Sequence, residues 1–227
     1  VNEWFGKTII NSDRRFSYKE AQKVIDSGTG DMKDEILTLH NLAQLLRKER
    51  FMKGSISFER DEVKFDIDED GRPMGIYFRE YGTANELIEE FMLLANKKVA
   101  GLIGEISNRK EQRTFVYRIH DKPNFEKLQK FASFILKFGH KINFGSGKKI
   151  AESLNKVLYD VKGSKEQDLV ENLALRAMAK AEYSTSNIGH YGLGFKYYTH
   201  FTSPIRRYPD MLVHRLLHDH LNQQTSK

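Results

Sequence analysis

The spacing of apolar residues changes along this chain, and that change limits the folds it can adopt. Most segments carry apolar residues three or four positions apart, which places them on one face of an α-helix. A shorter section alternates apolar and polar residues, as half-buried β-strands do: Val63, Phe65 and Ile67 against Lys64, Asp66 and Asp68. Helices and strands in separate runs favour the α+β class, with a mixed sheet and surrounding helices.

Local signals place the boundaries of these elements. Two capping boxes, Ser17–Glu20 and Thr83–Glu86, predict helix starts, and Gly28 predicts a helix end. Asp70-Gly71 predicts a hairpin turn. The expected helices cover about 18–27, 32–50, 83–99, 124–136, 150–159, 167–181 and a last run from Pro209. The expected strands cover about 4–10, 55–58, 63–67, 74–78 and 115–119.

Composition narrows the class of protein further. The 227 residues suffice for one sizeable domain or two small ones, and no stretch is apolar enough for a membrane span. The chain has no cysteine, which excludes disulfides and thiolate metal sites and fits a cytoplasmic location. Its net charge of +6 suits an anionic partner such as nucleic acid. Both ends look cut, so we expect a fragment.

The most informative stretch, Gly189–Asp210, lacks periodicity and leads into the last helix. A helix start presents free N–H groups that suit phosphate, and arginine can grip a phosphate through two hydrogen bonds. Tyrosine and histidine rings can stack on unpaired bases. The alternative is that the rings fill a core and that Arg206 pairs with Asp210, four residues on. From the residues alone, both interpretations stay open.

The segment His190–His214 resembles the signature of the RNB family, the catalytic domain of ribonucleases II and R. Three further segments resemble others of that family in the same order: Gly54–Phe58, Leu87–Asn96 and Tyr117–Pro123. The likeness is closest to the ribonuclease R branch and runs from about Trp4 to Leu217. It implies a partial RNB catalytic fold over residues 1–227, with helices around an RNA channel.

The resemblance also implies an activity. Such enzymes degrade single-stranded RNA from its 3′ end and release 5′-mononucleotides, using water activated by magnesium ions. It implies that Arg206 is the catalytic arginine at the scissile phosphate and that Phe58 stacks on the terminal base. The alternative for Phe58 is core packing. The remaining RNA-binding candidates that it implies are Glu89, Glu90, Asn96, His190, Tyr191, Tyr198, Thr199, Ser203, Pro204, Arg207 and Tyr208.

This sequence departs from the family at its metal site. The four aspartates that bind the metal in family members lie upstream of the matched region, and the flanking OB-fold domains and the end of the domain are missing. We therefore expect magnesium only in the intact parent and no exonuclease activity from this chain alone. Two alternatives stay open: a non-catalytic module that binds single-stranded RNA, and a structural remnant that binds nothing.

Three other patterns resemble ligand sites without meeting their requirements. Asp66–Gly71 begins like a calcium-binding EF-hand loop, but Tyr77 stands where that loop needs glutamate. Asp210, His214 and His218 lie on successive turns of one helix, too far apart to converge on one metal. Gly145–Lys149 lacks the spacing of a phosphate-binding loop. We expect a hairpin turn, solvated or packed side chains, and a plain loop, respectively.

Overall fold

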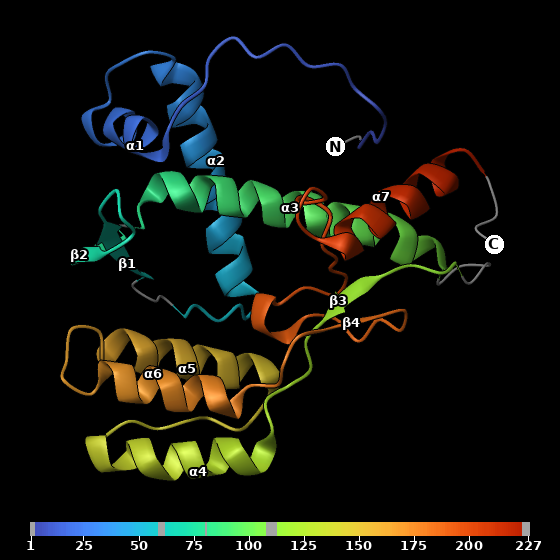
Figure 1. Ribbon diagram of the computed structural model, residues 1–227. Helices are drawn as coiled ribbons and strands as arrows, with labels where there is room; N and C mark the ends of the chain where they lie inside the picture. Colours follow the sequence, from blue (N-terminus) through green and yellow to red (C-terminus); the bar gives the residue numbers. More distant parts are fainter. Residues whose placement is uncertain (1–2, 59–61, 80, 108–112, 224–227) are drawn as a thin grey trace. The chain divides into compact units, whose positions relative to one another are not determined.

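The computed structural model describes residues 3–58, 62–79, 81–107 and 113–223 (Figure 1). The chain divides into two compact units. Unit 1 contains Val1–Ser12, Lys48–Ser57 and Met92–Lys227, and unit 2 contains Asp13–Arg47 and Phe58–Phe91. Two long helices, α2 (Lys33–Met52) and α3 (Thr83–Ser107), contribute residues to both units.

Unit 2 begins with helix α1 (Tyr18–Ser27), and the predicted capping box forms at its start. The Glu20 amide donates to Ser17 Oγ at 3.3 Å, and the Ser17 amide donates to Glu20 Oε2 at 2.7 Å. Gly28 ends the helix in the left-handed conformation, with φ of 65°. Two of the free N–H groups at this helix start are thereby satisfied by local sequence alone.

The hairpin of unit 2 also forms where the sequence predicts it. Strand β1 (Glu62–Ile67) pairs in antiparallel fashion with β2 (Pro73–Arg79). Asp68 Oδ1 accepts hydrogen bonds from the amides of Asp70 and Arg72, at 3.0 and 2.8 Å. The turn uses this carboxylate internally, as expected for a hairpin and not for a calcium loop.

The capping box predicted at Thr83 is wrong. Thr83 is already the first residue of α3, and its Oγ1 accepts from Gln22 Nε2 at 3.0 Å. Glu86, the expected partner, instead forms an ion pair with Arg47 at 3.1 Å. Contacts with residues distant in sequence have displaced the local motif. The helix also continues past Val99, because Ala100 and Ile103 are buried in the core of unit 1.

Unit 1 contains a group of three helices: α4 (Phe125–Ile135), α5 (Gly147–Asp160) and α6 (Gln167–Ala177). Figure 1 shows them side by side, and α6 contacts both of the others. Asn124 caps α4 and Ser146 caps α5, so Gly145–Lys149 is a capped helix start and not only a loop. Helix α4 ends at Ile135 and is followed by a single 3₁₀ turn, η1 (Leu136–Phe138), in which Leu136 is 54% exposed.

A second part of unit 1 packs the end of α3 against α7 (Tyr208–Leu221) and a short sheet. Strand β3 (Tyr117–Ile119) pairs in antiparallel fashion with β4 (Glu182–Ser184). The core that joins them consists of Val99, Ala100, Ile103, Phe115, Tyr117, Tyr197, Val213 and Leu217. The α+β class is confirmed.

The strands are arranged differently from the expectation. Among the described residues they form two separate two-stranded sheets instead of one mixed sheet. Residues 4–10 and 55–58, expected as strands, are irregular. Ile9 and Ile10 are fully or largely exposed, whereas Phe5 packs against the core. A strand is stable only when it pairs with a neighbouring strand, and an alternating pattern of residues does not show whether such a neighbour exists.

A short turn, η2 (Tyr191–Leu193), packs closely on the segment after α2. The Ile56 amide donates to the Gly192 carbonyl at 2.8 Å. Gly194 follows with φ of 66°, and a Cβ placed there would lie 3.0 Å from the Lys53 carbonyl oxygen. Both the backbone conformation and the close approach therefore require glycine at this position.

We expect Gly194→Ala to lower the free energy of unfolding by more than Gly163→Ala. Gly163 also has a positive φ, of 79°, but a Cβ there would meet nothing within 4 Å. The control therefore carries only the cost of the left-handed conformation, about 1 kcal/mol, and Gly194→Ala adds the steric clash. Urea unfolding of both variants measures the difference, and equal losses would contradict the proposed close packing.

Candidate nucleic-acid interface

The carboxylate of Asp210 holds the loop before α7 in place. This side chain is fully buried, and its Oδ2 accepts from the Ser203 amide and from Arg207 Nη2, both at 2.8 Å. The alternative interpretation that Arg206 pairs with Asp210 is therefore wrong, because Arg207 occupies that position. Arg206 is exposed.

Asn96 of α3 holds the other end of the same loop. Its side chain is buried, and its Oδ1 accepts from the amides of Phe201 and Thr202 at 2.9 and 3.2 Å. Its Nδ2 donates to the Tyr198 hydroxyl at 3.2 Å. All of these bonds are within the protein, so Asn96 acts on a ligand only through the loop that it positions.

Between these two anchors the loop presents an exposed tip. Pro204, Ile205 and Arg206 are exposed, and Tyr208, at the start of α7, is 63% exposed. Arg207 is the residue before α7, and no side chain caps the helix start there. Pro209, in the first turn of this helix, has no N–H, so the exposed guanidinium of Arg206 is the donor that suits a phosphate group at this tip.

Four aromatic and imidazole side chains lie ring to ring in unit 1. The ring centroids of His120 and His190 are 5.0 Å apart, those of His190 and Tyr198 5.1 Å, and those of Tyr198 and His200 5.8 Å. Burial lowers the pKa of His190 to about 3 and that of His200 to about 4, with smaller effects from neighbouring cationic groups. These imidazoles are therefore neutral at pH 7.

His120 is a structural residue that the sequence did not single out. Its Nδ1 accepts from the Gly192 amide at 2.9 Å, and its Nε2 donates to the Ala179 carbonyl at 2.9 Å. Both nitrogens are used by the backbone, so the ring is held in one orientation. No local pattern indicates this role, because both partners are distant in sequence.

The other candidates in unit 1 differ in accessibility. His190, Tyr191, Ser203 and Arg207 are half-buried, whereas Tyr198 and Thr199 are buried. Thr199 Oγ1 donates to the Val116 carbonyl at 2.6 Å. Tyr191 donates its hydroxyl to the Gly147 carbonyl at 2.8 Å, and burial raises its pKa to about 12. The buried pair and Arg207, which is held by Asp210, can support the loop, and the other three half-buried side chains can reach a ligand.

Unit 2 carries the three remaining candidates. Glu90 is buried, with its carboxylate 3.7 Å from the Arg47 guanidinium. Glu89 Oε2 accepts from the Tyr81 hydroxyl at 2.5 Å. Phe58 is half-buried, and residues 59–61, which follow it, lie outside the described part of the chain. The roles proposed for these three residues stay predictions.

The described residues offer neither a cluster of metal ligands nor a membrane-spanning helix. No group of three or more His, Asp or Glu side chains in these ranges could hold a metal ion. His214, one of the spaced ligand-like residues, instead stacks on Phe201 with ring centroids 4.0 Å apart. Within the same ranges, no helix is both long and apolar enough to cross a lipid bilayer.

Comparison with known proteins identifies the class to which this fold and loop belong. The chain matches the RNB domain over residues 1–223, and it is therefore a member of the RNB family. Ribonuclease R of Thermotoga maritima is 38% identical, over 95% of this chain and 30% of the relative. The inactive exonuclease DIS3L2 of Arabidopsis thaliana is 33% identical, over 96% of this chain and 23% of the relative.

A solved structure agrees with this assignment. Mycoplasma genitalium RNase R, in complex with ribose-methylated single-stranded RNA, superposes with a TM-score of 0.79 at 31% identity. The match covers 91% of this chain and 32% of that protein. The chain thus spans about a quarter to a third of the length of the relatives that it matches. The expected resemblance to the RNB family, and to its ribonuclease R branch, is confirmed.

We expect Asn96→Ala to destabilise the protein by about 2–3 kcal/mol, because it leaves two partly buried backbone N–H groups without an acceptor. Tyr198→Phe is the matched control, since it removes only the single bond between the two side chains. That loss should cost about 1 kcal/mol. Urea unfolding gives both values, and a smaller effect for Asn96→Ala than for Tyr198→Phe would exclude the anchoring role.

We expect the protein to lose stability as the pH falls below about 6.5, the ordinary histidine pKa. Because the folded-state pKa of His190 is about 3, the unfolded chain binds a proton that the folded chain does not. The slope for one such group is at most about 1.4 kcal/mol per pH unit, and partial exposure reduces it.

The variant His190→Asn tests whether His190 causes this loss of stability at low pH. Asparagine can accept from the Leu193 amide, as His190 Nδ1 does at 3.2 Å, but it does not titrate. Unfolding measured between pH 7.5 and 5 should depend less on pH in this variant than in the wild type. The matched control is His218→Asn, at an exposed histidine. Identical pH profiles in wild type and His190→Asn would assign the acid sensitivity to other groups.

Proposed function

We propose that this chain binds the 3′ end of single-stranded RNA, and that the full-length protein containing it degrades RNA in the 3′-to-5′ direction. In this proposal the protein works processively and releases 5′-mononucleotides by hydrolysis. The observation that carries the proposal is the exposed Arg206 on a rigidly held loop, in a chain of the RNB family. RNase R of Mycoplasma genitalium, a relative of similar fold, is itself described in complex with single-stranded RNA.

The two adjacent arginines have different tasks in this proposal. Arg207 is committed to the buried carboxylate of Asp210, so it fixes the loop. Arg206 is exposed and can place its N–H donors on phosphate oxygens. Negative charge accumulates on those oxygens as water attacks the phosphodiester, and a fixed cation there would stabilise the transition state.

The aromatic residues would hold the bases. Tyr208 is exposed beside Arg206, and Tyr191 and His190 are half-buried further along the loop. Rings of this kind stack on unpaired bases without regard to sequence, which suits an enzyme that accepts any RNA. Phe58 would stack on the terminal base in the same way. Glu89 and Glu90 belong to the same RNA-binding proposal through the family resemblance.

Magnesium enters this proposal through the family resemblance alone. The described residues contain no side-chain group that fits a metal ion, so we assign the metal-dependent step to no residue of this chain. The chain's own contribution is to bind and orient RNA. A cytoplasmic location is also part of the proposal, supported by the absence of cysteine.

A second candidate is a non-catalytic module that binds single-stranded RNA. One relative at 33% identity is named an inactive exonuclease, so relatives at this level of similarity include a protein named as inactive. The two candidates share the RNA-binding loop and differ in turnover. Release of mononucleotides by the full-length protein with magnesium would favour the enzyme, and binding without release would favour the module.

We expect Arg206→Ala to lower the turnover of the full-length protein by about a hundredfold to a thousandfold while RNA affinity changes little. Loss of one contact that forms mainly in the transition state costs about 3–4 kcal/mol. The measurement is single-turnover degradation of a labelled single strand, together with its dissociation constant.

The matched control is Arg215→Ala, which removes the same charge from an exposed position of α7. It should leave turnover close to the wild-type value. If Arg206→Ala instead weakened binding a hundredfold at unchanged turnover, Arg206 would be a binding residue without a catalytic role. If Arg215→Ala lost turnover equally, the effect would be one of general charge.

A further inference from the structure

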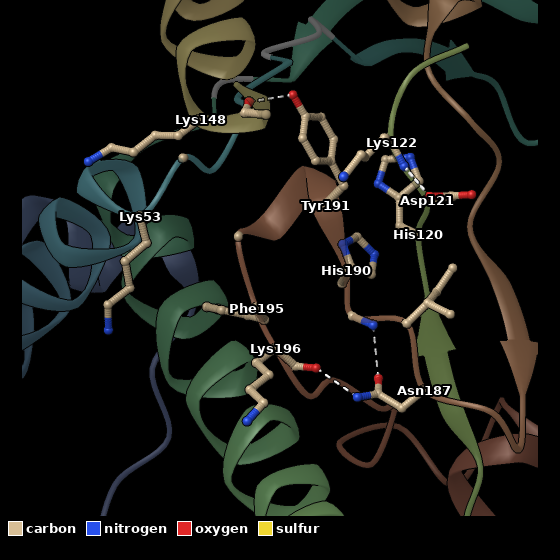
Figure 2. Close-up of a pocket in the computed structure, with 15 residues that line it drawn as sticks. Lys53, His120, Asp121, Lys122, Lys148, Asn187, His190, Tyr191, Phe195 and Lys196 are labelled. Carbon is tan, nitrogen blue, oxygen red and sulfur yellow. Dashed lines mark hydrogen bonds between the residues drawn. The ribbon is translucent and has the colours of Figure 1, made fainter. Parts of the chain in front are cut away.

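A pocket of about 560 Å³ lies in unit 1, and the residues that line it are drawn in Figure 2. Four segments that are separate in the sequence form these walls: residues 53–54, 120–122, 147–148, and 187–191 with 194–196. Arg206 is not among the lining residues. His190 and Tyr191, which the proposed function places against the bases, do line it, so the pocket adjoins the proposed RNA-binding site without including the loop tip.

The walls of this pocket are held by hydrogen bonds between the segments. His120 accepts from the Gly192 amide, and Tyr191 donates to the Gly147 carbonyl. Asn187 donates to the Lys196 carbonyl at 2.9 Å and accepts from the Gly189 amide at 3.0 Å. Figure 2 shows the bonds of Tyr191 and Asn187 to the backbone of other lining residues. The shape is thus fixed before any ligand arrives, which lowers the entropic cost of binding.

The charge of the lining is positive. Four lysines contribute to it, and Asp121 is its one carboxylate among the described residues. Lys53 pairs with Glu49, and Lys148 lies 3.8 Å from Glu152, so these two ammonium groups are partly neutralised. The lining histidines do not add charge at pH 7, because burial lowers the pKa of both.

Two lysines carry the remaining positive charge. Lys122 and Lys196 have no acidic partner within the part of the chain that the structure describes, and both are exposed. The Lys196 ammonium lies 5.1 Å from the centre of the Tyr197 ring, which leaves its charge unneutralised. Asp121 turns Oδ1 toward the Lys122 amide at 2.7 Å, so its carboxylate is engaged by backbone.

We propose that this pocket binds a phosphate group, with Lys122 and Lys196 as its principal cationic contacts. A cavity with a fixed shape, an excess of lysine and neutral rings suits one phosphate with an attached sugar or base. The phosphate can come from two sources. One is the backbone of a bound RNA strand, which rests on the proposed function, and the other is a free nucleoside monophosphate, which does not.

The test uses the full-length protein and the double variant Lys122→Gln/Lys196→Gln. The matched control is Lys127→Gln/Lys130→Gln, which removes the same charge from exposed positions of α4 outside the pocket. The probes are inorganic phosphate, adenosine 5′-monophosphate and a labelled single-stranded RNA. Binding of each is measured over a range of salt concentrations, and a thermal melt of each variant verifies its folding.

The pocket variant should lose about tenfold or more in affinity for its phosphate ligand, whereas the control should change little. If the source is the RNA backbone, RNA affinity falls and the logarithmic salt slope decreases by about 0.7 for one lost phosphate contact. If the source is a free nucleotide, binding of the monophosphate falls and RNA affinity is unchanged.

Equal affinities of the two double variants for all three probes would overturn the proposal. If the pocket variant melted early, the single variant Lys122→Gln would replace it, because that side chain is exposed and makes no ion pair among the described residues. Failure of the wild type to bind RNA would count against the proposed function alone, since inorganic phosphate and the monophosphate still test the pocket.

Discussion

The buried carboxylate of Asp210 determines the shape of the loop on which the proposed function depends. A charge at a fully buried position is costly unless it is paired, and here the Ser203 amide and the Arg207 guanidinium pair with it. These two contacts close the chain into the turn that leaves Arg206 facing outward. Asn96 adds a second anchor from α3, so the loop is held at both ends. Because the backbone of the loop is already held, binding of a phosphate by Arg206 would not require the loop itself to become ordered.

Much of the fold follows from local sequence, and the failures have a common physical cause. The α1 capping box and the β1–β2 turn depend on residues within four positions of each other, and both form as predicted. The Thr83 box fails because Gln22 and Arg47 reach it from elsewhere in the chain. The strand expected at residues 4–10 fails because alternation cannot specify a neighbouring strand. A local motif fails to form where a side chain distant in the sequence provides a competing hydrogen bond or ion pair.

The candidate site shows the same division. The motif around Arg206 could be found from the order of residue types, and the resemblance to the RNB family that it indicated is confirmed. Sequence could not show that Arg207, rather than Arg206, pairs with Asp210, because both lie within reach of that carboxylate along a helix start. It also gave no sign of His120, whose two partners are 59 and 72 positions away. The basic pocket was missed for this reason, since its lysines come from separate segments.

The buried histidines have a consequence for how the protein would respond to its surroundings. A phosphate site made of solvent-exposed imidazoles binds phosphate more tightly as the pH falls, because each ring gains a positive charge near pH 6.5. His190 and His200 stay uncharged in that interval. If the chain binds RNA as proposed, these two rings therefore add no charge to the RNA-binding loop as the pH falls through this interval, and their own contribution to binding stays independent of pH.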